Sequence, residues 1–210
     1  MLKRTLSSFF IISLSNKIKI MGKFRRLFHV LLFVIKLHGK QKRKYTNTPY
    51  WFHLFRVAKT VYLTTKDEIS TVVALAHDTL EDVEGCTHRE LDRFFNEFYP
   101  PHEVKKIIEG IEHLTDEYVR ISYPELNRKK RKQLEAERLG RIPAWLQTIK
   151  YADLIDNTKS IVKHDKDFSV VYLQEKEELL NQMRQGNAFL YSEAVMSLLN
   201  AQEKLKNNGK

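Results

Sequence analysis

The sequence contains few of the residues that tight turns and covalent cross-links need. Its 210 residues include 7 glycines and 5 prolines, too few for the many turns of an all-β protein. A single cysteine, Cys86, excludes an internal disulfide and is consistent with a reducing compartment. No apolar run approaches the roughly 20 residues that a membrane-spanning helix requires. We therefore expect a helical cytoplasmic protein without a membrane span.

Acidic residues are absent from the first third of the chain. Residues 1–66 contain 15 Lys and Arg residues and no carboxylate, and the first acidic residue is Asp67. Of the 36 basic residues, 21 remain for the rest of the chain, against 26 acidic ones, so the net charge of +10 originates in the N-terminal third. Such a region could attract phosphates, nucleic acid or an anionic membrane surface, although a lysine-rich solvated face has the same composition.

The chain shows no internal repeat and no linker that would divide it into two domains. We predict a basic, poorly ordered N-terminal extension over residues 1–21, with Met21 as the more natural start. A single folded domain would follow over 22–200, and a polar tail over 201–210.

Apolar residues recur at helical spacing along most of the predicted domain, so we expect an all-α fold. Capping boxes at Thr65-Lys66-Asp67-Glu68 and Thr87-His88-Arg89-Glu90 mark two helix starts. Pro100-Pro101 interrupts the helical pattern. Predicted helices cover residues 23–37, 88–99, 102–113, 124–139 and 143–163. One more begins near residue 50, and another runs from the first capping box to about residue 82. One or two further helices extend to about residue 200.

The most informative stretch is VVALAHDTLED, residues 72–82, which reads as one helix. At helical pitch Glu81 would lie one turn beyond His77, and Asp82 one turn beyond Asp78. Burying such charges without a partner costs free energy. A bound metal ion is the simplest explanation for them.

Two imidazoles and two carboxylates in apolar surroundings form a mixed nitrogen and oxygen set that suits Mn²⁺, Fe²⁺ or Zn²⁺. The predicted ligands are His53, His77, Asp78 and Asp153. A cation there could hold a water in an open position, lower its pKa and polarise a phosphoryl oxygen. His53 and His77 could instead be ordinary core histidines, but the neighbouring carboxylates argue against that interpretation.

Four segments resemble, in order, the motifs of HD-domain metal-dependent phosphohydrolases. The likeness is closest to the RelA/SpoT-type hydrolase domain, which degrades the alarmone (p)ppGpp. It covers roughly residues 24–185 and includes that family's Q-x-R-K loop, its HD-x-x-ED helix, its G-x-T-K-L-like turn and its K-x-AD-x-x-x-N helix. The segments are HGKQKRKYTNTPYWFHLFRVA (38–58), ALAHDTLEDVEGCT (74–87), EGIEHLT (109–115) and IKYADLIDNTKSI (149–161).

The resemblance implies a single HD-domain helical bundle that acts as a stand-alone hydrolase, without a synthetase domain. It implies that the four ligands hold one metal ion, usually Mn²⁺. Glu81 and Asp82 would orient or deprotonate the attacking water. Arg43 and Lys44 would contact the nucleotide, and Asn157 would touch the substrate or support the site. The reaction would remove pyrophosphate from the 3′ position of a guanosine polyphosphate.

Two departures limit the resemblance to the family pattern, and two other functions stay open. Leu54 follows His53 where the family usually has proline, and His113 stands near the position of a family lysine, which bears on base recognition. An HD phosphohydrolase for another nucleotide phosphate ester is one alternative. A non-catalytic nucleotide-binding or RNA-binding protein is another, although no nucleic-acid motif is found and Glu81 and Asp82 would then serve no purpose.

Overall fold

A computed structural model describes residues 21–44 and 46–208, so most of the predicted N-terminal extension lies outside the described residues. Residues 21–38 are helical. The helices that follow are α2 (Trp51–Thr65), α3 (Glu68–Ala76), α4 (Thr79–Asp82), α5 (His88–Phe95), α6 (Pro101–Leu114), α7 (Arg128–Leu139), α8 (Ala144–His164), α9 (Lys166–Gln182) and α10 (Ala188–Asn208).

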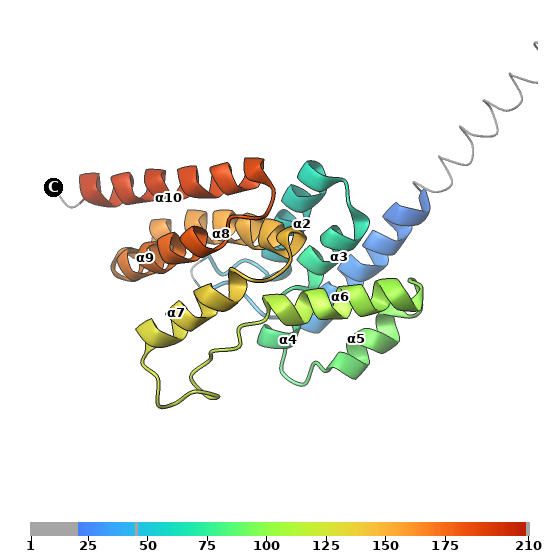
Figure 1. The fold of residues 1–210 in the computed structure, drawn as a ribbon. Helices are drawn as coiled ribbons and strands as arrows, with labels where there is room; N and C mark the ends of the chain where they lie inside the picture. The colour runs from blue at the N-terminus through green and yellow to red at the C-terminus, as the bar shows by residue number, and fades with distance from the viewer. Residues whose placement is uncertain (1–20, 45, 209–210) are drawn as a thin grey trace, which may run out of the picture.

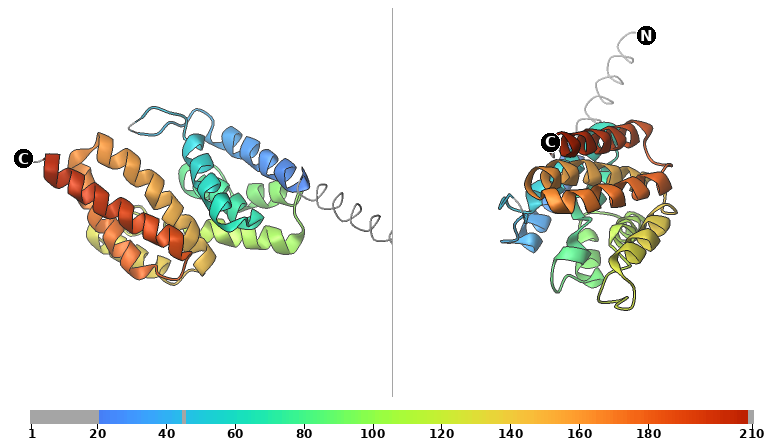
Figure 2. Two further views of the ribbon diagram at one scale, coloured as in Figure 1. Left: turned by 90° about the horizontal axis from the view of Figure 1, so that it is seen from above. Right: turned by 90° about the vertical axis from the view of Figure 1, so that its left-hand side faces the viewer.

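The helices form two groups that meet along α8 (Figure 1). Helices α7 to α10 form one group, in which α10 packs on α8 and α9, and α7 packs on α9. The other group contains segment 21–38 and α2 to α6, with α3 packed on α2 and α6. Helix α8 contacts α2, α3 and α6 as well as its own group, and the view from above in Figure 2 shows the two groups side by side.

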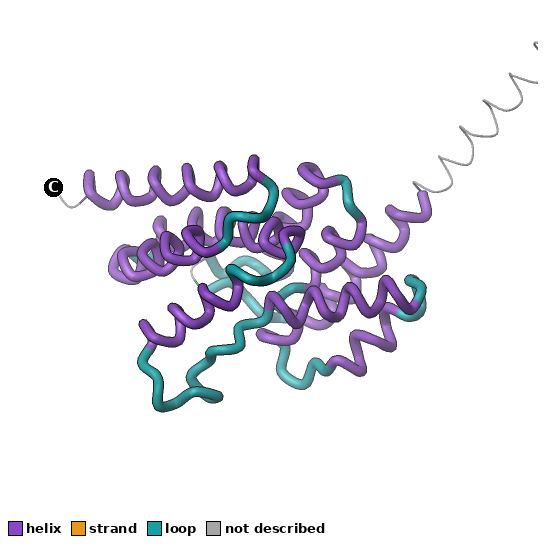
Figure 3. Tube along the Cα trace, viewed as in Figure 1, coloured by secondary structure: helices purple, strands orange, loops and turns teal. Residues whose placement is uncertain are grey.

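The prediction of an all-α fold is confirmed. Within the described ranges there is no strand, only one isolated bridge between Lys42 and Pro49 in the basic loop (Figure 3). None of the described helices is both long enough and apolar enough to cross a bilayer. The apolar spacing therefore predicted the secondary structure class correctly.

The helix predicted through residues 72–82 is wrong, because the chain breaks at the His-Asp pair. Helix α3 ends at Ala76 and α4 begins at Thr79, with His77 and Asp78 in the turn between them. The Thr79 hydroxyl donates to the Ala76 carbonyl at 2.7 Å, a side-chain bond that competes with regular helix. Asp78 has φ −96° and ψ 2°. Because these angles are not helical, its carboxylate points in a different direction from the one it would have in a straight helix.

One of the two helix starts predicted from capping boxes agrees with the structure, and the other differs from it. Thr87 caps α5 as predicted, accepting from the Glu90 amide. The cap of α3 is Asp67 rather than Thr65, since the Asp67 carboxylate accepts from the Ser70 amide at 2.7 Å. Glu68 does not complete a capping box; it pairs with Arg26 of segment 21–38.

Two predicted boundaries also shift. Helix α7 begins at Arg128 rather than 124, because the Asn127 side chain caps it by accepting from the Lys130 amide. It is not wholly exposed, since Ala136 and Leu139 are buried. Helix α10 continues to Asn208, and Ala201 belongs to the core, so residues 201–208 are helical rather than a tail. The rest of the domain division stays a prediction.

Gly110 allows α6 to approach its neighbours closely. A Cβ at this position would lie 2.8 Å from the Trp145 ring of α8 and 3.0 Å from Val73 of α3. These distances are shorter than side chains tolerate. The glycine therefore helps to set the spacing of the three helices beside the His-Asp turn.

Candidate metal centre and active site

The fold brings together the four side chains predicted as metal ligands. His53 comes from α2, His77 and Asp78 from the turn before α4, and Asp153 from α8. His53 Nε2 lies 3.2 Å from Asp153 Oδ1, and His77 Nε2 lies 3.2 Å from Asp78 Oδ1 and 3.8 Å from Asp153 Oδ1. Ligand atoms of His53, His77 and Asp153 all lie within 4.8 Å of one another, so this cluster could bind a metal ion.

His77 is oriented as a metal ligand would be. Its Nδ1 lies 2.9 Å from the Ala74 carbonyl oxygen, which can only accept, so Nδ1 carries the proton and donates. Its Nε2 is buried, faces the cluster and has no hydrogen-bond partner within the described part of the chain. An orphaned buried nitrogen beside two carboxylates fits a cation as the missing partner.

The electrostatics of the cluster also favour a cation. Burial opposes the imidazolium form of His77, but the carboxylates of Asp78 and Asp153 outweigh this and raise its pKa to about 9. Asp153 is itself buried, yet Lys150 and the two histidines hold its pKa well below the usual value. Asp153 is therefore ionised near neutral pH, and its field would attract a divalent ion.

Asp156, which the sequence interpretation did not single out, orients His53. Its Oδ2 lies 2.7 Å from His53 Nδ1, so His53 presents Nε2 to the cluster. The same carboxylate accepts two bonds from Arg56, at 2.6 and 2.9 Å. Although burial disfavours its charge, His53 and Arg56 keep the pKa of Asp156 below its usual value. Its position one helical turn beyond Asp153 was the only signal available in the sequence.

Three more side chains hold the carboxylate ligands in place. The Tyr50 hydroxyl donates to Asp78 Oδ2 at 2.7 Å. The Asn157 amide donates to Asp153 Oδ1 at 2.6 Å, and Lys150 Nζ lies 3.0 Å from Asp153 Oδ2. Tyr50 and Lys150 lie in family-like segments, and Lys150 is the lysine of the K-x-AD-x-x-x-N motif, but the sequence interpretation assigned neither a role.

The two basic residues predicted to bind substrate have different positions. Arg43 is buried and donates to Asn157 Oδ1 at 2.8 Å, while its other nitrogen lies 3.6 Å from Asp156 Oδ2. It thus ties the basic loop to α8. Lys44 is exposed in that loop and is not among the residues that line the cavity beside the cluster.

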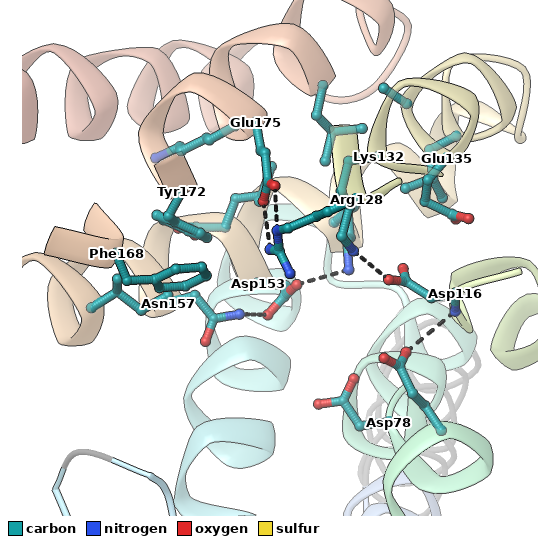
Figure 4. A pocket seen from close by; sticks show the side chains of 18 of the residues that line it. Asp78, Asp116, Arg128, Lys132, Glu135, Asp153, Asn157, Phe168, Tyr172 and Glu175 are labelled. Atoms are coloured by element: carbon teal, nitrogen blue, oxygen red, sulfur yellow. Dashed lines mark hydrogen bonds and ion pairs between the residues drawn. The ribbon is translucent and has the colours of Figure 1, made fainter. Parts of the chain in front are cut away.

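A cavity of about 310 Å³ opens beside the cluster of His53, His77 and Asp153 (Figure 4). Asp78, Glu81 and Asp82 line it, together with Asp153 and Asn157 from α8. Its opposite wall is formed by α7 and α9, whose lining side chains include Arg128, Lys132, Phe168, Tyr172 and Glu175.

Ion pairs join the elements around this cavity. Arg128 of α7 makes two bonds to Glu175 of α9, at 2.7 and 2.9 Å. Lys132 lies 2.6 Å from Asp116 in the loop after α6. Cationic side chains therefore face the carboxylates across a space open to solvent.

The two predicted catalytic carboxylates face the same cavity. Glu81 accepts from the Asp116 amide at 3.2 Å, and Asp82 accepts from the Gln41 side chain at 3.2 Å. Surrounding protein disfavours the charge on Glu81, the Asp116 carboxylate adds to the effect, and the pKa of Glu81 rises to about 7. A carboxyl pKa raised in this direction is what a general acid or base needs near neutral pH.

We compared the chain with known proteins. No family model matches it. It is 28% identical to a GTP pyrophosphokinase rsh of Brucella ovis over 143 residues, which cover 64% of this chain and 17% of that protein. It is 38% identical to a guanosine-3′,5′-bis(diphosphate) 3′-pyrophosphohydrolase of Aquifex aeolicus over 79 residues, 38% of this chain and 10% of that protein. The chain spans about a sixth or less of the length of these relatives.

A solved structure shares the fold. It is described as a metazoan ortholog of SpoT that hydrolyzes ppGpp and plays a role in starvation responses. The TM-score is 0.69 at 20% identity, over 83% of this chain and 94% of the other. At this identity the match establishes that the two chains share an all-α fold. In sequence and in fold, the chain thus resembles the RelA/SpoT-type hydrolase domain, as its motifs predicted.

Proposed function

We propose that this chain is a metal-dependent phosphohydrolase that removes the 3′-pyrophosphate of guanosine polyphosphate alarmones, (p)ppGpp, in the cytoplasm. The observation that carries the proposal is the buried His53, His77 and Asp153 cluster, whose neighbouring cavity is lined by Glu81 and Asp82. The names of the two relatives and of the structural neighbour support the choice of substrate.

In this proposal His53, His77, Asp78 and Asp153 hold Mn²⁺ or a similar divalent ion. Such an ion would polarise a phosphoryl oxygen and lower the pKa of a nearby water. The chain prepares the ligands itself: Asp156 and the Ala74 carbonyl set the two imidazole orientations, and Tyr50 holds Asp78.

Glu81 would accept the proton of the attacking water. A base is most effective when its pKa lies close to the working pH, and the pKa of Glu81 is about 7. Asp82 would orient the same water, while its bond from Gln41 fixes its position. Neither carboxylate is needed as a metal ligand, so both can act on water.

The substrate phosphates would lie between the metal cluster and α7. Lys132 and Arg128 line that wall and would offset the charge that develops on the phosphoryl oxygens. Asn157 lines the cavity and would touch the substrate, and the basic loop with Arg43 and Lys44 would contact the nucleotide. Arg43 would do so only if its bond to Asn157 rearranged.

The engaged state of Arg43 favours one other candidate. With Arg43 bound to Asn157 and Lys44 away from the cavity, the same chemistry would serve another nucleotide phosphate ester. The metal centre and the two catalytic carboxylates would be unchanged, and only the nucleotide contacts would differ.

Release of pyrophosphate from ppGpp by the purified chain with Mn²⁺ tests the proposal. Asp78→Ala should abolish turnover, whereas Asp92→Ala, an exposed aspartate of α5, should not. Nucleoside monophosphates and 3′-phosphorylated nucleotides provide a parallel panel. Turnover confined to that panel would reject the alarmone as substrate, and metal binding without any turnover would indicate a sensor.

A further inference from the structure

The outward face of segment 21–38 is apolar where a solvated helix would be polar. Met21, Phe24, Phe28 and Leu32 are 72%, 55%, 57% and 46% exposed. Their spacing of three or four residues puts them on a single stripe along the helix. We call these four residues the outer stripe.

The opposite face of the same helix is packed against the core. The outer stripe is therefore not the core-facing side of a helix that has been rotated outwards. Val30 and Val34 are fully buried. The Phe33 ring stacks on Phe94 with centroids 3.8 Å apart, and His29 stacks on Phe98 at 4.8 Å. The left view of Figure 2 shows this helix along one edge of the fold, with the other described helices to one side of it. The stripe is therefore presented by a fixed element.

The helix that carries the outer stripe has no acidic residue of its own, although the exposed Glu90 and Glu97 line a groove with Leu32 and Lys36 at one end of the stripe. Lys23, Arg25 and Lys36 are exposed on the same helix, and no acidic residue occurs before Asp67. The one acidic partner of this helix among the described ion pairs, Glu68, binds Arg26.

Exposed apolar side chains beside basic ones also occur on α2, next to the outer stripe. The Phe24 ring contacts Tyr62 with centroids 6.3 Å apart, and the Lys66 ammonium lies 5.3 Å from the centre of the Tyr62 ring. The adjacent Leu63 is 57% exposed. Apolar side chains bordered by lysines thus extend beyond one end of the stripe.

We propose that the outer stripe and its basic border bind an anionic lipid surface. Aromatic and aliphatic side chains on one face, flanked by Lys and Arg, are what an interfacial helix inserts among lipid headgroups. Each basic residue near an anionic leaflet raises the affinity about fivefold. A second copy of the chain fits less well, because pairing two such faces would bring like charges together. Nucleic acid would leave the aliphatic Met21 and Leu32 unused.

Binding through this face would leave the candidate active site accessible. None of the residues that line its cavity comes from segment 21–38. The inference is therefore independent of the proposed hydrolase function, and either can fail without the other.

Co-sedimentation of the full chain with vesicles tests the inference. One set of vesicles is phosphatidylcholine alone, and the other contains about 30% phosphatidylglycerol. We expect binding to the anionic set that weakens as salt is raised. The double variant Phe24→Ser, Phe28→Ser should bind about tenfold more weakly or worse, since two exposed aromatic rings no longer insert.

The matched control is Phe189→Ser with Leu199→Ser on α10, where both side chains are also exposed, at 63% and 51%. This variant should bind vesicles like the parent chain. Circular dichroism and thermal melting verify that each variant is folded. Equal binding by the stripe variant and the control would overturn the inference, as would no binding to anionic vesicles. A concentration-dependent dimer lost only in the stripe variant, without vesicle binding, would assign the face to a second copy.

Discussion

His53 Nδ1 lies 2.7 Å from Asp156 Oδ2, although 103 residues separate the two in sequence. The bond joins α2 to α8 and turns His53 Nε2 towards Asp153. A carboxylate behind a metal-binding histidine fixes its orientation and raises its basicity.

Asp156→Asn is therefore expected to weaken Mn²⁺ binding about 10- to 100-fold, because the imidazole loses its charged acceptor. Isothermal titration calorimetry measures the change. Asp92→Asn on the exposed side of α5 is the matched control and should bind Mn²⁺ like the parent chain. Unchanged affinity in Asp156→Asn would mean that His53 is not a ligand or is held by other contacts.

Binding of the metal ion should stabilise the fold. A ligand that binds only the folded state at a hundred times its Kd adds about 2.7 kcal/mol, or about 5–10 °C in Tm for a chain of this size. Differential scanning fluorimetry with and without Mn²⁺ measures the shift, and a chelator should reverse it. The variant His77→Ala should show little or no shift. An equal shift in that variant would place the bound ion elsewhere.

Glu81→Gln is expected to lower kcat about 100- to 10,000-fold, because glutamine cannot accept a proton from water. Since Glu81 is proposed to act beside the metal rather than on it, Mn²⁺ affinity should hardly change. Glu84→Gln, in the exposed turn that follows α4, is the control. Loss of metal affinity along with activity would instead make Glu81 a ligand.

Lys176 is almost completely buried between α8, α9 and α10, where it donates to Thr158 at 2.8 Å and Ser197 at 3.3 Å. Burial lowers its pKa to about 7, which the Asp153 charge only partly offsets. Between pH 7 and the usual lysine pKa, the unfolded chain binds more protons than the folded one. The contribution of Lys176 therefore makes stability rise with pH across that range.

Lys176→Met should remove that dependence and stabilise the fold at pH 6 by up to about 5 kcal/mol, because no buried charge has to form. Urea unfolding at pH 6, 8 and 10 compares the two chains. The exposed Lys163→Met on α8 is the control. A slope that persists in Lys176→Met would assign it to other groups.

Gly110→Val is expected to destabilise the fold by about 1–3 kcal/mol, because new atoms would overlap Trp145 and Val73. Gly22→Ala is the contrasting change, since only the end of the Arg26 side chain comes within 4 Å of its added Cβ. That variant should be neutral or slightly stabilising through helix propensity. Thermal unfolding measures both. Equal Tm values would show that α6 can move away from α8 at little cost.

The sequence by itself determined the helices and the identity of the reactive side chains. Local spacing decides which face of a helix is apolar, so the all-α class and most helix bounds could be predicted from the 3.6-residue period. The His-Asp pair, Glu81 and Asp82 were evident because ionisable residues in an apolar run need a partner. Their roles as ligands and catalytic groups stay predictions.

Only the tertiary structure decided how these groups are oriented. The support of His53 by Asp156 and of Asp78 by Tyr50 joins residues that are far apart in the sequence, and the apolar periodicity does not specify these contacts. Hydrogen bonds depend on distances of tenths of an ångström, which follow from how α2, α3 and α8 pack against one another and not from the local sequence of any one of them.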